Sequence, residues 1–176
     1  MSPTLQTLSE YRQKFAPNVD LAELLQATLD TLLMLGGALV LTLAIGLPLG
    51  VILYLTARGR LLAAPALHAG LGLMVNILRA VPFVILLILL IPVTVALVGT
   101  SLGVQGAIVP LVIGTAPFFA RLVEAALKEV DHGVIEASQA MGARPHQIVF
   151  GTLLPEALPG LLAAGTVTAV ALVSYT

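Results

Sequence analysis

The sequence predicts an all-α integral membrane protein, a polytopic bundle of about four membrane-spanning helices. Hydrophobic residues make up 59% of the 176 residues and charged residues only 10%, whereas a soluble domain needs charged residues to cover its surface. The few charges are clustered, so charge-free runs long enough to cross a bilayer lie between them. The net charge of −1 does not indicate nucleic-acid binding, and the absence of cysteine excludes disulfides and cysteine metal sites.

The first thirty residues are polar and lack the early apolar core of a cleaved signal peptide. We therefore predict a polar extracytoplasmic segment over 1–30 and a transmembrane domain over 31–176. No charged residue lies between Asp30 and Arg58. This run predicts a first span that begins at Thr31, with Asp30 as its N-cap.

Within this span, Gly46 and Gly50 have the spacing that lets two helices approach closely. Pro48, which lies between them, equally fits a proline kink without any close contact. The sequence leaves both interpretations open.

Residues 80–120 contain no charge, and 41 residues would form a single helix of about 60 Å, twice the hydrocarbon thickness. The run must turn, and the glycine-containing stretch 98–103 is its turn signal. We predict a second span over about 77–98 and a third over about 104–122. Their four prolines fit moving or substrate-lining helices but are also tolerated without a function: Pro82, Pro92, Pro110 and Pro117.

The apolar stretch 61–78 contains Pro65, two glycines and Asn76. We interpret it as an interfacial helix that leads into the second span, with a span of its own as the alternative, because short apolar runs discriminate poorly between the two. The charge-free residues 157–176 are just long enough to form a fourth span.

Lys and Arg are enriched on the cytoplasmic side of membrane proteins. In this arrangement Arg12 and Lys14 fall on one face, and six basic residues fall on the other: Arg58, Arg60, Arg79, Arg121, Lys128 and Arg144. We therefore predict that the N-terminus is outside. Arg79 and Arg121 are interpreted as orientation determinants near the cytoplasmic face, with a gating role as the alternative for Arg79. No charged side chain is expected inside a span, which argues against an ion-coupled carrier.

A polar loop at about 124–156 precedes the fourth span. Asp131 can cap a short helix over His132 to Met141, Gly142 suits its left-handed end, and Pro145 fits the first turn of a second helix that reaches Leu154. Periodicity predicts one apolar face on each helix: Val134, Ile135, Ser138 and Met141 on the first, and Ile148, Val149, Thr152 and Leu153 on the second. Pro155 and Pro159 are expected to break the chain before the fourth span.

Glu136 and Gln139 point away from the apolar face in this arrangement. Two interpretations stay open from periodicity alone. The loop can lie on the lipid surface as an amphipathic element, or it can dock onto a cytoplasmic partner whose arginine meets the glutamate.

The loop resembles the cytoplasmic EAA loop of ABC importer permeases, in which Glu-Ala-Ala is followed by glycine six residues after the glutamate and by a final Leu-Pro. The matching residues here are Glu136, Ala137, Ser138, Gly142, Leu154 and Pro155. Further stretches, such as "NILRAVPFVILLILLIPVT" and "LLPEALPGLLAAGTVT", resemble the permease subunits of methionine-uptake ABC transporters. The resemblance runs from about Thr31 to the last residue.

The resemblance implies an importer permease of the bacterial inner membrane that works by alternating access. Its partners would be two copies of a cytoplasmic ATPase that touch the EAA loop, a second permease copy and an extracytoplasmic substrate-binding lipoprotein. ATP and magnesium would bind to the ATPase, since this chain has no G-x-x-x-x-G-K-[ST] phosphate loop and is expected to hold no cofactor. The chain is thus expected to be a transporter subunit rather than an enzyme.

Three departures from the family pattern stand out. Ser138 replaces the second alanine of the motif, Thr152 replaces an aliphatic residue and is expected to weaken the hold of the loop on the bundle, and Arg144 stands in place of a capping threonine. The family's fifth span is missing, so a truncated or fragmentary chain is also an expectation.

No metal site is expected either, because His68, His132 and His146 have no second histidine or cysteine three or four residues away. Two other functions stay open. The chain could be a permease for another amino acid or small solute, or a membrane scaffold that transports nothing.

Overall fold

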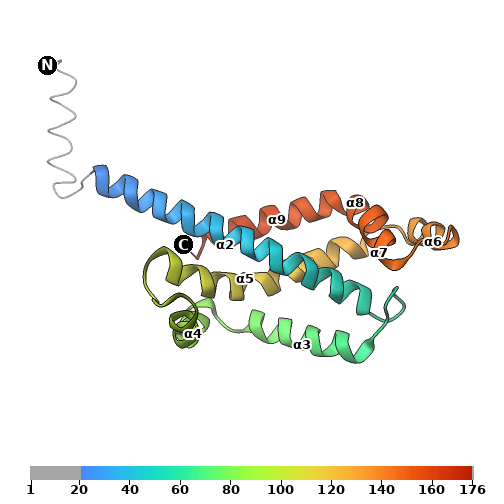
Figure 1. The fold of residues 1–176 in the computed structure, drawn as a ribbon, viewed down its shortest axis with the longest axis horizontal. Helices are drawn as coiled ribbons and strands as arrows, with labels where there is room; N and C mark the ends of the chain where they lie inside the picture. Colours follow the sequence, from blue (N-terminus) through green and yellow to red (C-terminus); the bar gives the residue numbers. More distant parts are fainter. Residues whose placement is uncertain (1–20, 176) are drawn as a thin grey trace, which may run out of the picture.

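The computed structural model describes residues 21–175, and every regular element in this range is helical, which confirms the all-α prediction (Figure 1). Residues 1–20 of the predicted polar segment lie outside the described residues. The elements are α2 (Leu21–Thr56), α3 (Pro65–Ala80), α4 (Phe83–Val98), α5 (Gly103–Lys128), α6 (His132–Ala140), α7 (Pro145–Ile148), the π-helical turn η1 (Val149–Leu153), α8 (Leu154–Glu156) and α9 (Leu158–Val173).

Two of these helices, α2 and α5, are each long and apolar enough to cross a membrane alone. Two further spans are available if each of two bent pairs counts as one: α3 with α4, which meet at 109°, and the segment α7–α8 with α9, which meet at 69°. The described residues thus provide two to four spans, a range that includes the predicted four.

The first helix starts earlier than predicted. Asp30 is not an N-cap, because α2 begins at Leu21 and passes through it without a break. The stretch "LAELLQATLD" holds neither glycine nor proline and is rich in strong helix formers, so nothing in it ends a helix. The charge-free run predicted the apolar part of α2 but not the residue at which the helix begins.

The predicted second span over about 77–98 is not a single helix. α3 ends at Ala80, Val81 takes an extended conformation, and Pro82 precedes the first residue of α4. A residue before proline is pushed out of the helical region, so the break falls where the sequence places Pro82. In Figure 1, α3 runs beside α5 along the bundle, whereas α4 is seen almost end-on. This placement favours the alternative in which 61–78 lies among the spans.

The most extensive helix contact joins α2 and α5, and it depends on two glycines. A Cβ atom on Gly46 would lie 2.7 Å from Cδ1 of Phe119, and one on Gly50 would lie 2.6 Å from the backbone oxygen of Ala120. Such distances leave no room for a side chain. The close-approach interpretation is therefore correct, although Pro48 also lies inside the helix.

A second feature of this interface is a buried hydrogen bond between the hydroxyl groups of Thr42 and Thr115, at 2.8 Å. Polar pairs of this kind join helices where no water is available to satisfy the hydroxyls.

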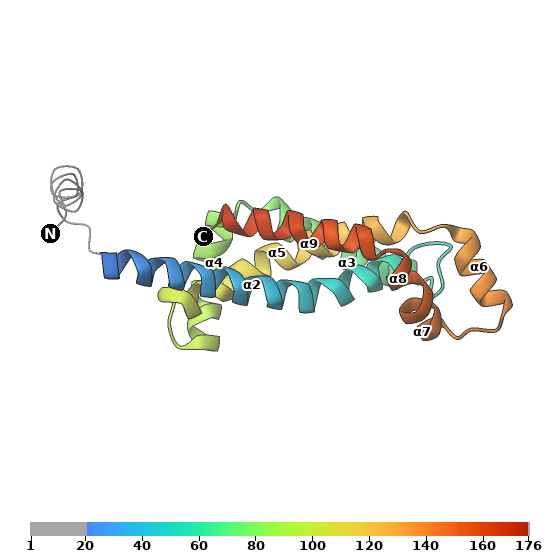
Figure 2. The same ribbon diagram turned by 90° about the horizontal axis from the view of Figure 1, so that it is seen from above.

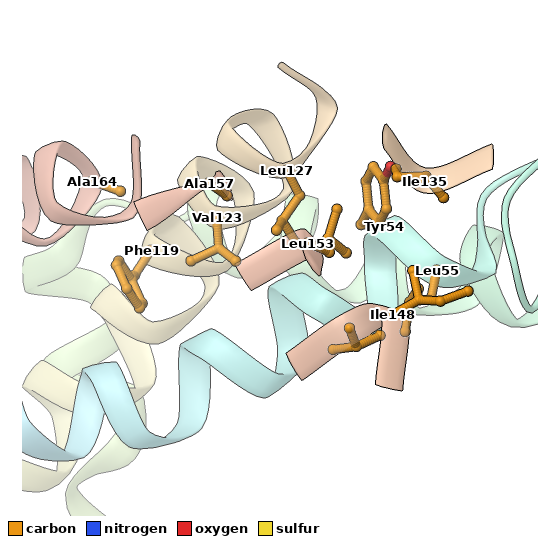
Figure 3. Packing of buried hydrophobic residues seen from close by; sticks show 11 residues of the cluster. Tyr54, Leu55, Phe119, Val123, Leu127, Ile135, Ile148, Leu153, Ala157 and Ala164 are labelled. Carbon is orange, nitrogen blue, oxygen red and sulfur yellow. The ribbon is translucent and has the colours of Figure 1, made fainter. Parts of the chain in front are cut away.

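The largest apolar cluster lies where the bundle meets the segment between α5 and α9 (Figure 3). It joins residues of six elements: Tyr54, Leu55, Phe119, Val123, Leu127, Ile135, Ile148, Val149, Leu153, Ala157 and Ala164. Seen from above, α6 and α7 project at the end of the molecule opposite the start of α2 (Figure 2). The cluster therefore holds this projecting segment on the rest of the protein.

Candidate functional site

The α5–α9 loop, residues 129–157, is built by the local signals that the sequence predicts. An Asp131 carboxylate oxygen accepts a hydrogen bond of 2.6 Å from the backbone N–H of Gly133 and so caps α6. Gly142 follows the helix with φ 79°, and its N–H donates to the carbonyl of Gln139 at 2.9 Å. Glycine adopts this left-handed conformation without the strain that a Cβ atom would cause. The predicted cap and the predicted glycine turn are both confirmed.

The second half of the loop starts at Pro145, as predicted, in the first turn of α7. The Gln147 side-chain oxygen accepts a hydrogen bond of 2.8 Å from the backbone N–H of Arg144. Because this cap uses only the backbone of Arg144, the loss of a threonine there leaves it intact. The second helix is not uniform, since α7 passes into η1, a wider turn.

One face of the loop packs on the bundle. Ile135, Ile148 and Leu153 are buried, as predicted. Val134 and Met141 were predicted on the same face, but both are exposed, Met141 at 81%. The reason is geometric. α6 is only nine residues long and contacts η1 and α7 over a short stretch. These contacts bury the apolar side chains of only one helical turn and leave those at its two ends exposed.

The motif residues fall into two groups. Glu136 and Ala137 are exposed on α6, as is Gln139, and they form the outward surface of the loop. Ser138 is 7% exposed and faces inward, whereas Leu154 and Pro155 lie at the other end of the loop, in α8. The break before α9 falls at Ala157, between the two predicted breakers Pro155 and Pro159, each of which stands in the first turn of a helix.

Two of the departures from the family pattern meet. The hydroxyl oxygens of Ser138 and Thr152 are 3.0 Å apart and share a hydrogen bond between α6 and η1. Ser138 also donates to the carbonyl of Val134 at 3.0 Å. The expected weakening by Thr152 therefore does not follow from the geometry, because its hydroxyl has a partner that an alanine at position 138 could not supply.

A third contact, which no sequence pattern indicated, ties the loop to α2. A guanidinium nitrogen of Arg60 lies 2.8 Å from the Tyr54 hydroxyl and 2.6 Å from Nε2 of His132. The guanidinium also stacks on the Tyr54 ring at 4.5 Å. Glu136 lines the hollow beside this group. Arg60 thus links the end of α2 to the first residue of α6, at a sequence separation that no local pattern reveals.

The two arginines predicted as orientation or gating residues have different surroundings. Arg121 pairs with the carboxylate of Glu124 at 2.6 Å and donates to the carbonyl of Gly72 and the side chain of Asn76 on α3. Lys128 holds the other oxygen of Glu124, which is 2% exposed. This network, centred on the buried carboxylate of Glu124, joins α5 to α3.

Arg79 stands outside that network. Its guanidinium carbon lies 5.9 Å from the centre of the Phe118 ring in α5. Phe118 is ten residues from the end of α5 and fifteen from its start, so Arg79 lies well inside the length of the bundle. Arg79 is exposed within the described residues, and the expectation that no charged side chain lies inside a span stays a prediction.

No group of three histidine or acidic residues that could hold a metal lies within residues 21–175. Two of the three histidines have other contacts. His68 bonds the carbonyl of Leu53 at 3.0 Å through Nδ1, and His132 contacts Arg60.

Residues 46–176 match the family described as the binding-protein-dependent transport system inner membrane component. The D-methionine transport system permease protein MetI of Escherichia coli K12 is 56% identical over 131 residues, which are 74% of this chain and 60% of that protein. The methionine import system permease protein MetP of Bacillus subtilis 168 is 50% identical over 164 residues, 93% of this chain and 74% of that protein. This chain thus spans about 60% of the length of the Escherichia coli relative that it matches.

Among solved structures, a chain of the MetNI methionine ABC transporter in an inward-facing conformation superposes with a TM-score of 0.86 at 50% identity, over 88% of this chain and 72% of that one. A chain of an amino acid ABC transporter with histidines shares only the fold, with a TM-score of 0.57 at 20% identity.

Proposed function

Because the chain belongs to the family of binding-protein-dependent transport system inner membrane components, we propose that it is the membrane-spanning permease subunit of an ATP-driven methionine importer. The likeness predicted from the EAA loop is confirmed by the relatives, which are transport permeases of the inner membrane. Methionine is the substrate that the names of these relatives indicate. A permease for another amino acid is the second candidate.

The observation that carries this proposal is the construction of the α5–α9 loop. Its inner face is anchored by Ile135, Ile148 and Leu153 in the core cluster, whereas Glu136 and Ala137 face outward. A surface that is exposed, charged and firmly attached to the spanning helices suits a docking site through which a separate ATPase moves the bundle. ATP and magnesium belong to that subunit.

The orientation follows from the same proposal. The α5–α9 loop lies in the cytoplasm and the N-terminus lies outside. Because the chain contains no cysteine, single cysteines at Gln139 and Thr100 would report the two faces. An impermeant maleimide applied to intact cells is expected to label Thr100→Cys and to spare Gln139→Cys. Labelling of Gln139→Cys from outside would refute the arrangement.

The partner contact is tested by co-purification. The chain is co-expressed with the ATP-binding subunit of a methionine importer, and the recovered ATPase is measured. Glu136→Lys is expected to lower recovery at least tenfold, since a charge-assisted hydrogen bond contributes about 1.5–3 kcal/mol. Glu129→Lys is the matched control, because Glu129 is also exposed and lies outside α6. Equal recovery with both variants would remove Glu136 from the contact.

Transport itself is measured as uptake of labelled methionine by cells that lack their own importer and express this chain with its ATPase and binding protein. Competition by unlabelled amino acids separates the two candidates. Uptake that methionine fails to suppress would favour the permease for another substrate. The mass of the solubilised complex tests the further proposal that it contains two permease and two ATPase subunits.

A further inference from the structure

The bend between α3 and α4 opens into a cavity among four helices. The cavity has a volume of about 170 Å³, and residues of α3, α4, α5 and the end of α9 line it. Its lining includes aromatic rings: Phe118 on α5, and the stacked pair Phe83 and Tyr175, whose ring centres are 4.5 Å apart. Leu86 adds an aliphatic wall. Apolar and aromatic side chains combined with a few polar groups are the usual lining of small-molecule sites.

Arg79 is the charged residue in the lining. It lies opposite Phe118, at a point about 15 Å from one end of α5 and about 22 Å from the other, at 1.5 Å per residue. Arg79 is exposed on the described chain, and an ionisable side chain this far from both ends of a spanning helix is by default a candidate functional residue. The structure gives it a ring contact but no carboxylate among the described residues, whereas Arg121, one turn further along α5, is paired with Glu124.

The cavity therefore presents an unneutralised guanidinium beside aromatic and aliphatic side chains. The first residue of α4, Phe83, lies in the same lining, and the first N–H groups of a helix have no partner within it and favour a negative charge. Guanidinium binds carboxylate with two parallel hydrogen bonds. The complementary ligand carries one carboxylate and a slender apolar side chain.

We infer that Arg79 binds the carboxylate of the transported amino acid, and that the aromatic rings of the cavity contact its side chain. This inference rests on the proposed transport function and adds the residue that recognises the substrate within the membrane. A thioether suits such a lining, because sulfur makes favourable contacts with aromatic rings. Binding the substrate carboxylate would explain why an arginine lies at this position. Its place next to the bend and the positive-inside rule do not explain it.

The test measures binding of labelled methionine to the purified complex of this chain with its ATPase, without the binding protein, and with the ATPase alone as blank. Competition by methioninol, in which an alcohol replaces the carboxylate, isolates the contact with Arg79. The wild-type complex is expected to prefer methionine at least tenfold. This preference should fall to about one in Arg79→Gln and should stay at the wild-type value in Arg58→Gln, a change of an exposed arginine outside the cavity.

Arg79→Lys is a second variant, which keeps the charge but loses the two-pronged geometry, so its preference should fall severalfold. The amount of complex recovered by size exclusion shows whether each variant assembles. A wild-type preference in Arg79→Gln, or no binding by the wild-type complex above the blank, would overturn the inference. If cells nevertheless take up methionine, only the Arg79 site fails; if they do not, the transport function fails.

Discussion

The α2–α5 interface and the α5–α9 loop are held in different ways. In the interface, two glycines of α2 lie so close to α5 that no side chain fits on either of them, and one pair of threonines among the described residues supplies a polar contact. In the loop, short helices are joined by a few buried side chains, one hydroxyl pair and a glycine turn. The close backbone approach allows only one relative position of α2 and α5, whereas the contacts of the loop can break one at a time. This difference suits a protein in which the α2–α5 interface is rigid and the α5–α9 loop can adjust to a partner.

The largest expected effect is loss of the interface. Gly50→Leu places a side chain 2.6 Å from the backbone oxygen of Ala120 and from Cβ of Val123. The backbone cannot give way as a side chain does, so the cost should exceed the about 1–3 kcal/mol that is typical of overpacking. We expect almost no monodisperse protein after detergent extraction.

Gly36→Leu is the matched control in the same helix, since nothing lies within 4 Å of a Cβ atom there. It should give wild-type yield. If both variants are recovered equally, the close packing of α2 on α5 is incorrect.

The next largest effect is expected to be confined to the α5–α9 loop and to leave the α2–α5 interface unchanged. Leu153→Ala empties a site that is 0% exposed in η1, and such changes cost about 2–5 kcal/mol. Hydrogen exchange measured by mass spectrometry should rise across α6 and α7 while α5 keeps its protection. Equal deprotection of α5 would show that the loop and the bundle open as one unit.

A smaller effect is expected at the glycine turn. Gly142→Ala forces a Cβ atom into a backbone with φ 79°, at a cost of about 1–2 kcal/mol. ATPase recovery should fall although Glu136 is unchanged, because the end of α6 moves. Gly151→Ala, at an exposed position with negative φ and no nearby atoms, serves as the control.

The smallest effect concerns the hydroxyl pair. Ser138→Ala and Thr152→Val each leave one partner without the other, whereas the double variant removes both. Thermal unfolding of the complex should show a coupling of about 0.5–1.5 kcal/mol, with the double variant closer to wild type than the two single changes would sum to. Strictly additive changes would mean that the 3.0 Å contact contributes nothing.

Helix caps and turns could be predicted from the sequence, whereas contacts between residues far apart in the chain could not. Asp131, Gly142 and Pro145 act within four residues of themselves, so their roles were predictable. The α3–α4 break was missed because counting charges treats a charge-free run as uniform and gives no weight to Pro82. In the sequence, Asn76 is only a polar residue that interrupts an apolar stretch. Its hydrogen bond with Arg121 depends on the packing of α3 on α5 and could not be predicted.

The candidate site divides in the same way. The exposed position of Glu136 followed from helical periodicity, and its place in a motif came from resemblance. The Arg60–His132 contact and the Ser138–Thr152 pair join residues whose proximity depends on tertiary packing. Arg79 could be placed on an aromatic ring only after α3 had been separated from α4.

The π-helical turn η1 also constrains the number of residues in this part of the chain. Ile148 and Leu153 are both buried although they are five residues apart, which is about 1.4 turns of an α-helix. A wide turn holds one residue more than an α-helical turn and brings both side chains to the same side. Deleting one residue between them would restore regular winding with a separation of four residues, about 1.1 turns, and would leave Pro155 and α9 facing nearly the same way. An inserted residue would instead turn everything that follows by about 100° around the axis.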